Sequence, residues 1–349
     1  MAIALPDWPR WLGEPLGAAN YRERLEDFEV EEMLGFSADG EGPHQLLWVE
    51  KRGTNTAFAA QALALHAGVP ERDIGYAGLK DRHALTRQYF SVPVVAGVDW
   101  DQLTVSGVRV LGVQLHRRKL RRGCHQGNRF RIVLRQMRCP DESLEQRLQT
   151  IATRGVPNYF GPQRFGRGGA NLRLVDGLLS GKRFPRSKRG YAISALRSLV
   201  FNDVVAERLR QGSINQAIGG DLLQLDGRGS WFRFDPADPD IGVRLKELEI
   251  HPTGPLPGRP RAEIDGATAE LEDRVLATHP LCLPTLDRLA VDADRRSLRM
   301  AVREFSWQRL ADEVLELRFE LSSGGYATSV MRELMELHDV HGQPEPEID

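Results

Sequence analysis

Strand-like sequence lies toward both ends of this chain, and sequence of another kind separates the two parts. Five segments have branched and aromatic residues between turn signals: residues 28–34, 45–51, 108–115, 129–134 and 314–321. Pro157 opens a glycine-rich stretch, and helical patterns such as residues 194–209 follow it. At 349 residues the chain is longer than the size at which one hydrophobic core keeps growing. The sequence therefore predicts a mixed α/β core that a second, helical and loop-rich segment interrupts.

Turn signals and apolar spacing indicate further elements. Residues 56–66 read as an alanine-rich helix, because Gly68 follows as a stop signal. Prolines and glycines are dense from residue 227 to residue 260, where we expect loops. After the Gly324-Gly325 pair, apolar spacing predicts a helix through Val330, Met331, Leu334 and Leu337.

The composition is that of an ordinary soluble protein. Hydrophobic residues make up 41% and charged residues 27% of the chain. No apolar run approaches the roughly 20 residues of a membrane helix, and the first residues lack the features of a signal peptide, so we expect a cytoplasmic protein. The cysteines, Cys124, Cys139 and Cys282, are too few and too scattered for a disulfide framework or a zinc site. His338 and His341 have no clear third ligand, so no metal site is predicted.

The charges are segregated along the chain, although the net charge is only −1. Residues 102–140 contain no Asp or Glu, and a second basic cluster lies at residues 182–189. The first stretch holds Arg109, Arg117, Arg118, Lys119, Arg121, Arg122, Arg129, Arg131, Arg135 and Arg138. Such segregation produces a local positive field, for which a polyphosphate backbone is the natural partner. The alternative is a basic face that is merely solvated.

One carboxylate stands among cations in residues 78–88, Gly-Leu-Lys-Asp-Arg-His-Ala-Leu-Thr-Arg-Gln. Lys80 and Arg82 flank Asp81, and nearby positive charge favours the ionised form of an acid. No second acid or thiol adjoins Asp81, which indicates nucleophilic or charge-stabilising chemistry. Alternatively, Asp81 is a hydrogen-bonded cap in a glycine-containing turn.

The strand-like sequence Gly-Asn-Arg-Phe-Arg-Ile that begins at residue 127 places different chemistry on its two faces. Side chains alternate along a strand, so Asn128 and Phe130 share one face while Arg129 and Arg131 share the other. An amide beside an aromatic ring suits a nucleobase, because the amide binds the base edge while the ring stacks on the base. Alternatively, Phe130 simply packs in the core.

Blocks of residues in a fixed order point to a family. The first is Gly78-x-Lys80-Asp81-x-x-Ala84-x-Thr86-x-Gln88. Further blocks are Asp27-Phe28-x-Val30-x-Glu32, Gly42-x-His44-x-x-x-Trp48-x-x-Lys51 with Asn55-Thr56, Gly127-Asn128-x-Phe130, Val156-Pro-Asn-Tyr-Phe-Gly-x-Gln163-Arg164-Phe165-Gly166, Arg197-Ser198-x-x-Phe201-Asn202, His251-Pro-Thr-Gly-Pro-Leu-x-Gly258 and Ala327-Thr328-Ser329-Val330-x-Arg332-Glu333-Leu334. Together they resemble the TruD family of tRNA pseudouridine synthases over residues 27–334.

The resemblance implies an α+β fold: a pseudouridine synthase core with a mixed, largely antiparallel sheet, interrupted by an inserted TRUD-type α/β domain. The catalytic domain would comprise residues 1–156 and 303–349, and the inserted domain residues 157–302. The implied activity is isomerisation of uridine to pseudouridine in tRNA, at uridine 13 in the D-arm region. No cofactor or metal would be needed, and we expect a monomer that requires no protein partner and no membrane.

Residue chemistry and the resemblance together assign roles. Asp81 would act as nucleophile or base while the C1′–N1 bond of the uridine breaks. Lys80 is the nearest cation, but adjacent side chains on an extended segment diverge, so a more distant basic residue is the alternative partner. The flipped-out base and its nucleotide would be bound by Lys80, Asn128, Phe130 and Tyr326. RNA contacts are expected from Arg117, Arg118, Lys119, Arg121, Arg122 and Arg164.

Two positions depart from the family's pattern. Tyr326 stands where phenylalanine is usual, which keeps a ring for stacking and adds a hydroxyl. Glu31 stands where a basic residue is common, which puts a basic contact near the site in doubt.

Two other functions are alternatives. One is a non-catalytic RNA-binding protein of the same fold. The other is an aspartate-dependent hydrolase or phosphoryl-transfer enzyme, which needs a metal cluster or a second acid beside Asp81. The sequence shows neither of these features.

Overall fold

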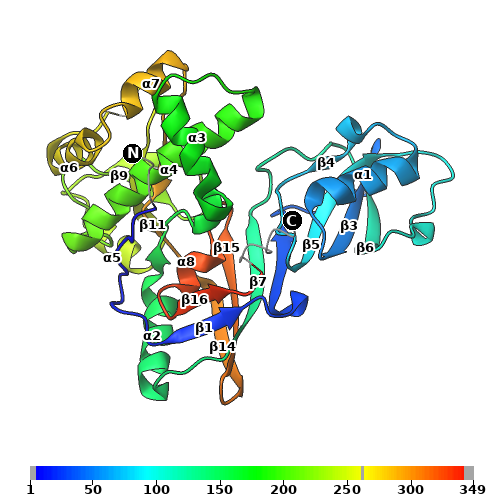
Figure 1. The fold of residues 1–349 in the computed structure, drawn as a ribbon, viewed down its shortest axis with the longest axis horizontal. Coiled ribbons are helices and arrows are strands. Elements are labelled where there is room, and N and C mark those ends of the chain that lie inside the picture. Colours follow the sequence, from blue (N-terminus) through cyan, green and yellow to red (C-terminus); the bar gives the residue numbers. More distant parts are fainter. Residues whose placement is uncertain (1–4, 261–262, 342–349) are drawn as a thin grey trace, which may run out of the picture. The chain divides into compact units, whose positions relative to one another are not determined.

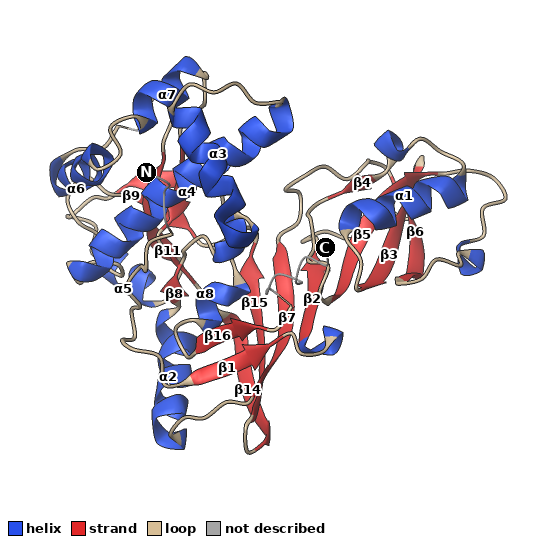
Figure 2. Cartoon of the chain, viewed as in Figure 1, coloured by secondary structure: helices blue, strands red, loops and turns tan. Residues whose placement is uncertain are grey.

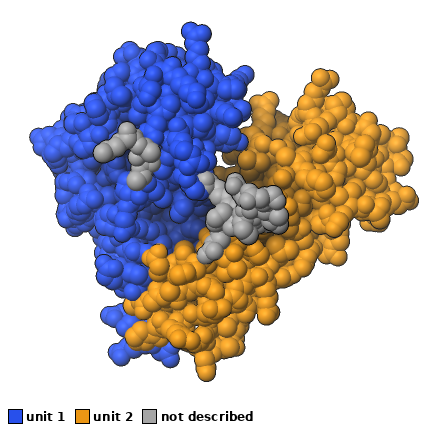
Figure 3. All heavy atoms as spheres, viewed as in Figure 1, with its two compact units in different colours: residues 1–15, 141–302, 325–334 blue, residues 16–140, 303–324, 335–349 orange. Residues whose placement is uncertain are grey.

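The computed structural model describes residues 5–260 and 263–341, which form two compact units (Figure 3). Unit 1 comprises Met1–Pro15, Asp141–Val302 and Gly325–Leu334. Unit 2 comprises Leu16–Pro140, Arg303–Gly324 and Met335–Asp349. Each unit is therefore assembled from segments that lie far apart in the sequence, as the colours of Figure 1 show. The expected division into a catalytic domain and an inserted domain stays a prediction.

A sheet of ten strands forms unit 2, and Figure 2 shows its strands in red. The strands are β1 (Ala18–Tyr21), β2 (Phe28–Met33), β3 (His44–Arg52), β4 (Gly75–Tyr76), β5 (Leu85–Pro93), β6 (Val108–His116), β7 (Gly127–Arg135), β14 (Arg303–Ala311), β15 (Val314–Ser322) and β16 (Glu336–Asp339). The main order is β14-β15-β7-β2-β5-β3-β6, while β1 pairs with β7 and β16, and β4 pairs with β5. In this sheet β1–β16 and β2–β5 are parallel and the other pairs are antiparallel. The predicted mixed, largely antiparallel sheet and the α+β class are confirmed.

Helix α1 (Thr56–Ala67) packs on this sheet (Figure 1). Asn55 caps its first turn by accepting a hydrogen bond from the N–H of Phe58 at 2.8 Å, and Gly68 ends the helix with a left-handed φ of 66°. Leu63 of α1 and Phe90 of β5 are fully buried in one core cluster. Burying a side chain of this size contributes roughly 1.5–3 kcal/mol. Short 3₁₀ helices in unit 2 are η1 (Leu25–Asp27), η2 (Glu71–Asp73) and η3 (Trp100–Gln102).

Unit 1 is mainly helical around a small sheet. Its helices are α2 (Asp141–Arg154), α3 (Ala170–Leu179), α4 (Arg186–Arg210), α5 (Ile241–Lys246), α6 (Gly266–Ala277), α7 (Cys282–Arg288) and α8 (Ala327–Met331), with 3₁₀ helices η4 (Pro162–Phe165) and η5 (Arg167–Gly169). The sheet order is β10 (Trp231–Arg233), β9 (Leu222–Leu225), β11 (Ile250–Leu256) and β12 (Asp294–Ser297), while β8 (Val156–Pro157) pairs with β13 (Arg299–Met300). Long α4 supplies much of the core through buried residues such as Leu196, Val200 and Phe201.

No helix in the described ranges combines the length and the apolar character that crossing a membrane requires. Within the same ranges, no group of three or more His, Cys, Asp or Glu side chains is arranged to hold a metal ion.

The five predicted strands and two of the three predicted helices are confirmed, but the third helix is shorter than expected. The helix predicted through Leu337 ends at Met331, and Leu337 lies in β16. Pairing of β16 with β1 satisfies that backbone instead, so a tertiary contact overrides the apolar spacing. Residues 227–260 contain β10, α5 and β11, and slightly more than half of the segment consists of the loops and turns that we expected. Strand β11 tolerates Pro252 and Pro255 because its first half pairs only with β9 and its second half only with β12.

Candidate active site

Asp81 lies in the loop between β4 and β5 with its carboxylate open to solvent. The side chain is 43% exposed, and Oδ2 accepts a hydrogen bond from Nη2 of Arg22 at 3.0 Å. No backbone N–H of the described residues donates to this carboxylate. Asp81 is therefore not the turn cap that the sequence left as an alternative, and its carboxylate is accessible and ion-paired.

The cation beside Asp81 is Arg22, which directly follows β1 and has a left-handed φ of 64°. Its guanidinium spans two carboxylates, since Nη1 also lies 3.3 Å from Oδ2 of Asp339 in β16. The guanidinium carbon stands 4.3 Å from the ring centre of Phe28 in β2. Strands β1, β2 and β16 therefore hold the Arg22 guanidinium in one position beside Asp81. The structure gives Asp81 the distant basic partner that was the alternative to Lys80, and no local spacing in the sequence marks it.

Lys80 points into unit 2 instead. Its Nζ lies 2.9 Å from Oε1 of Glu32, and the two side chains are 5% and 0% exposed. Oε2 of Glu32 also accepts a hydrogen bond from the N–H of Tyr89 at 3.0 Å. Breaking a buried pair of this kind is costly, because the remaining charge has no partner. Lys80 therefore anchors the loop, and its contact with substrate stays a prediction.

Hydrogen bonds hold the backbone that leads to Asp81. Oγ1 of Thr56, at the start of α1, accepts a hydrogen bond from the N–H of Lys80 at 2.9 Å and donates to Oε1 of Gln88 at 3.0 Å. Nε2 of Gln88 donates to the carbonyl of Gly78 at 3.2 Å. A Cβ on Gly78 would stand only 3.3 Å from Nζ of Lys80, so glycine leaves room for the lysine. Gly78, Lys80 and Gln88 of the block at residues 78–88 therefore form, together with Thr56, a framework that presents Asp81.

A second buried lysine adjoins this framework. Lys51 in β3 has no exposed surface, and its Nζ donates to a backbone carbonyl at 3.3 Å. Burial lowers the pKa of Lys51 to about 8, the charge of Lys80 acts in the same direction, and Asp81 and Glu32 oppose them. Burial, with Lys80, also lowers the pKa of His125. Sequence reasoning assigned no role to Lys51, although this residue belongs to one of the blocks that resemble the family.

The predicted alternation holds on β7. Phe130 is buried, while Arg129 and Arg131 on the other face form ion pairs. Asn128 lies opposite Glu32 of β2 in the strand ladder. Oδ1 of Asn128 is buried and has no hydrogen-bond partner among the described residues. An unpaired buried acceptor costs roughly 1–3 kcal/mol, so a donor that reached this oxygen would be favoured.

Phe130 packs among other aromatic rings of unit 2. Its ring stacks on Phe319 with centres 5.3 Å apart and meets Phe28 edge-on at 6.3 Å. Only 6% of Phe130 is exposed. This is the core placement that was the alternative to base stacking, and stacking of a base on Phe130 stays a prediction.

Tyr326 and Arg164 lie together in unit 1. Arg164 donates to the Tyr326 hydroxyl from Nη2 at 2.6 Å and from Nε at 3.1 Å, and to Oγ of Ser194 from Nη1 at 2.8 Å. Tyr326 also meets Phe160 edge-on, with ring centres 5.9 Å apart. Arg296 stands 4.2 Å from the centre of the Phe160 ring. Burial lowers the pKa of Arg296 to about 10, and the charge of Arg164 acts in the same direction. The roles predicted for Tyr326 and Arg164 toward RNA stay predictions.

Arg296 is a residue that sequence reasoning missed. It follows Arg295 in β12, and successive side chains of a strand point to opposite faces. Arg295 is buried against Glu272 at 2.6 Å. Two adjacent arginines in one strand were the available signal. Of the two departures from the family's pattern, the hydroxyl of Tyr326 holds Arg164, and Glu31 pairs with Arg129 at 3.3 Å.

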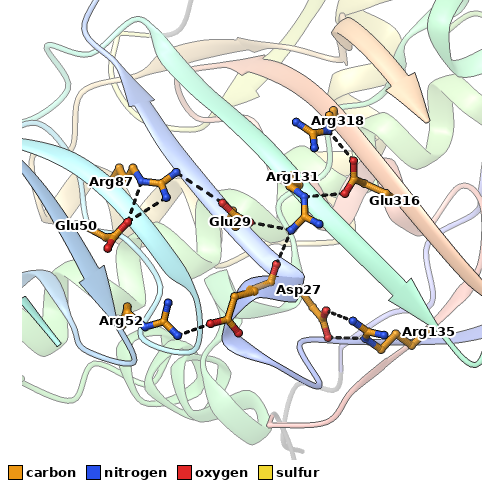
Figure 4. A network of polar contacts seen from close by, with 10 residues as sticks. Asp27, Glu29, Glu50, Arg52, Arg87, Arg131, Arg135, Glu316 and Arg318 are labelled. Atoms are coloured by element: carbon orange, nitrogen blue, oxygen red, sulfur yellow. Dashed lines mark hydrogen bonds and ion pairs between the residues drawn. The ribbon is translucent and has the colours of Figure 1, made fainter. Parts of the chain in front are cut away.

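Neighbouring strands neutralise much of the basic stretch from residue 102 to residue 140 (Figure 4). Arg131 in β7 lies 2.7 Å from Glu29 of β2 and 2.7 Å from Glu316 of β15. Four further arginines also pair with acids, from strands, from η1 or from the turn after β14: Arg109 with Glu50, Arg129 with Glu320, Arg135 with Asp27 and Arg138 with Glu313. The local positive field that we expected is therefore reduced at these five arginines, because acids from distant segments of the chain lie beside them.

The loop between β6 and β7 keeps exposed cations. Arg118 and Arg121 are exposed, and Arg121 has no ion-pair partner among the described residues. Arg122 is also exposed, and its guanidinium lies 4.0 Å over a tyrosine ring. Arg117 pairs with a carboxylate, and Lys119 donates to a backbone carbonyl. Unpaired positive charge of this stretch therefore concentrates at the tip of the loop, and RNA contact there stays a prediction.

Comparison with known proteins supplies the family. The family model for tRNA pseudouridine synthase D (TruD) matches residues 15–187 and 180–334. The curated tRNA pseudouridine synthase D of Methylococcus capsulatus is 43% identical over 343 residues, which is 97% of each chain. That of Hydrogenovibrio crunogenus is 41% identical over 339 residues, which is 96% of this chain and 98% of the relative. A solved TruD structure from Methanosarcina mazei shares the fold, with a TM-score of 0.72 at 21% identity over 98% of both chains. The chain therefore belongs to the tRNA pseudouridine synthase D (TruD) family.

Proposed function

We propose that this chain isomerises uridine to pseudouridine in tRNA, at uridine 13 in the D-arm region, with Asp81 as nucleophile or base. The observation that carries the proposal is the accessible carboxylate of Asp81, ion-paired with Arg22 on a loop that hydrogen bonds hold. Family membership supplies the reaction class, and the relatives named tRNA pseudouridine synthase D supply the substrate class. Location in the cytoplasm and a monomeric state stay predictions.

The reaction rearranges the nucleoside without a net gain or loss of atoms. The C1′–N1 bond breaks, the uracil turns, and C5 joins C1′, while N1 gains a proton and C5 loses one. A carboxylate either forms a transient bond to the sugar or removes a proton from it and steadies the developing positive charge. Both routes need Asp81 to be ionised and its carboxylate to be held in one orientation. Arg22 supplies that direction through its 3.0 Å contact with the carboxylate.

Asn128 is the candidate for holding the uracil while the base turns. Its buried Oδ1 lacks a donor, and N3–H of uracil is a donor of suitable chemistry. Taking the uridine out of its stack costs a few kcal/mol, and stacking of the free base on an aromatic ring offsets roughly 1–3 kcal/mol of this. Tyr326, which is half-buried, offers such a ring.

The test compares the wild type with Asp81→Asn, which keeps the size of the side chain and removes its charge. Each protein is incubated with an unmodified tRNA transcript, and pseudouridine is then mapped chemically. We expect product at position 13 with the wild type and none with Asp81→Asn. Asp101→Asn, an exposed aspartate elsewhere in unit 2, is the matched control and should retain full activity.

Three outcomes would contradict the proposal in different ways. Product at wild-type level with Asp81→Asn removes the aspartate mechanism. If pseudouridine forms in a transcript that has cytidine at position 13, the enzyme modifies another uridine and the assignment to uridine 13 is wrong. Absence of product with every tRNA in the wild type favours the non-catalytic RNA-binding alternative.

A further inference from the structure

Unit 1 holds a cavity of about 700 Å³ that residues at the end of α2 and in α5 line. Its remaining walls come from the turn after α4, the loop before α5 and Arg299 of β13. All of its lining residues belong to unit 1, and none is a residue of the candidate active site. The volume falls within the range of roughly 300–1,000 Å³ that is typical of small-molecule sites.

Three cations line this cavity: Arg154, Lys246 and Arg299. None of them has an ion-pair partner among the described residues. The one acid in the lining, Asp238, already accepts a hydrogen bond from the N–H of Asp240 at 2.9 Å. The charge of Arg154 acts together with burial to lower the pKa of Arg299 to about 10. The cavity therefore carries an excess of positive charge that an anion would relieve.

Arg299 is held in place rather than free to turn away. It is 2% exposed, and Nη2 donates to the carbonyl of Leu245 at 2.6 Å. Nε donates to Nδ1 of His251 at 3.4 Å, which assigns the remaining ring proton to Nε2. That nitrogen lies 2.9 Å from Oδ1 of Asp226. The chain from Asp226 through His251 fixes the guanidinium at the cavity wall, so the positive charge is built into the site.

The other walls suit a planar base. Phe234 and Pro236 supply apolar surface, and Asn215 and Gln216 bear side-chain amides. An aromatic ring accommodates the face of a base, and amides match the donors and acceptors of its edge. Guanidinium groups bind phosphate through paired hydrogen bonds. An inorganic anion leaves the apolar wall unused, and an apolar ligand leaves three cations without an anionic partner, although Arg154 also lies 4.4 Å over the ring of Trp11, so the combination favours a nucleotide.

We propose that this cavity binds a nucleotide, with its phosphate against Arg154, Lys246 and Arg299 and its base against Phe234. The nucleotide is either a residue of an RNA chain or a free nucleoside monophosphate, since the two present the same chemistry. The inference does not depend on the reaction at Asp81, so a pseudouridine assay that fails leaves it standing.

The experiment titrates the full-length protein with UMP, AMP and inorganic phosphate by calorimetry, and with unmodified tRNA transcript by filter binding. Arg154→Glu and Lys246→Glu reverse charges of the cavity, and Arg228→Glu reverses an exposed charge of unit 1 outside it. We expect each cavity variant to weaken binding of UMP at least tenfold and Arg228→Glu to change it less than twofold. Phe234→Ala should weaken binding of UMP and leave that of phosphate unchanged. Thermal unfolding of each variant verifies that it is folded.

The tRNA titration distinguishes the two sources of the nucleotide. Weaker tRNA binding by the cavity variants, together with competition between UMP and tRNA, supports a residue of the RNA chain. Loss of UMP binding with unchanged tRNA affinity supports a free nucleotide. The proposal is overturned if UMP and AMP show no saturable binding and tRNA affinity is the same in all variants. It is also overturned if binding of UMP survives both charge reversals.

Discussion

Arg22 joins two carboxylates of unit 2, Asp81 and Asp339, through one guanidinium group. It contacts the carboxylate to which we assign the chemical step, so its loss should affect that step more than binding. We expect Arg22→Ala to lower kcat roughly 10²- to 10³-fold, as removal of one charge-stabilising group does, with little change in KM. Arg22→Lys should restore part of kcat, since it keeps the charge but loses the planar fork that spans both acids.

Steady-state kinetics on an unmodified tRNA transcript measures the effects on kcat and on KM separately. Arg72→Ala, which removes an exposed arginine in another part of unit 2, is the control. A higher KM with an unchanged kcat for Arg22→Ala would mean that Arg22 binds RNA and does not position Asp81.

Oδ1 of Asn128 is a buried acceptor to which no donor in the described ranges is hydrogen-bonded. Asn128→Ala should therefore leave the free energy of unfolding within about 1 kcal/mol of the wild type, because it breaks no hydrogen bond of Oδ1. The same change should slow pseudouridine formation roughly ten- to a hundredfold, because the uracil edge is deprived of one hydrogen bond.

Asn55→Ala provides the opposite case. Asn55 caps α1, so we expect a loss of about 1 kcal/mol in stability and unchanged activity in the folded protein. Urea unfolding and the tRNA assay on both variants measure the contrast. If Asn128→Ala were the less stable of the two and equally active, Asn128 would be a structural residue.

At the scale of elements, strand β3 contains a buried lysine, Lys51, that adjoins the framework holding Asp81. The pKa of Lys51 is about 8 in the folded protein, against an ordinary value of 10.5. Between these two values the unfolded chain holds a proton that the folded chain has lost, so the contribution of Lys51 to stability rises with pH. Relative to Lys51→Met, the wild type should gain roughly 2–3 kcal/mol of unfolding free energy between pH 7 and pH 10.

Urea unfolding of both proteins at several pH values measures this difference. The subtraction removes the contributions of other groups that titrate in the same range, such as Cys282, whose pKa burial raises to about 12. The charged groups that face Lys51 are Lys80, Asp81 and Glu32. A difference that stays constant with pH would show that the ammonium of Lys51 is solvated in the native state.

Elements with local signals could be predicted from the sequence. Helix α1 has a stop signal at Gly68, and β7 alternates from Asn128 to Ile132, so both agree with the structure. The segment at Leu337 was mispredicted because its apolar spacing fits a helix, while a strand 318 residues away in sequence decides its conformation. The candidate site likewise depends on a contact between residues that are distant in sequence. Asp81 stands out in its signature, whereas Arg22 reaches it only once the sheet has formed.

At the scale of the whole molecule, charge that is segregated in the sequence is largely mixed in space. Residues 102–140 lack acids, yet Glu29, Glu316 and their neighbours stand beside the arginines of β7. Register between strands produces this pairing, and register is not visible in the order of charges along the chain. Electrostatic attraction to RNA in this part of the chain is therefore better sought in the loop between β6 and β7 than along the sheet.

This difference in pairing can be measured with two double variants of equal charge. Arg121→Gln with Arg122→Gln removes loop cations, whereas Arg109→Gln with Arg138→Gln removes exposed cations that already pair with carboxylates. Removal of a cation that binds one phosphate should reduce the slope of log affinity against log salt concentration by roughly one. We expect the first pair to weaken tRNA binding and flatten the slope by about one to two, and the second pair to leave both nearly unchanged. Equal effects of the two pairs in filter binding over a range of salt would mean that tRNA responds to the net charge of the protein and that the loop makes no phosphate contact of its own.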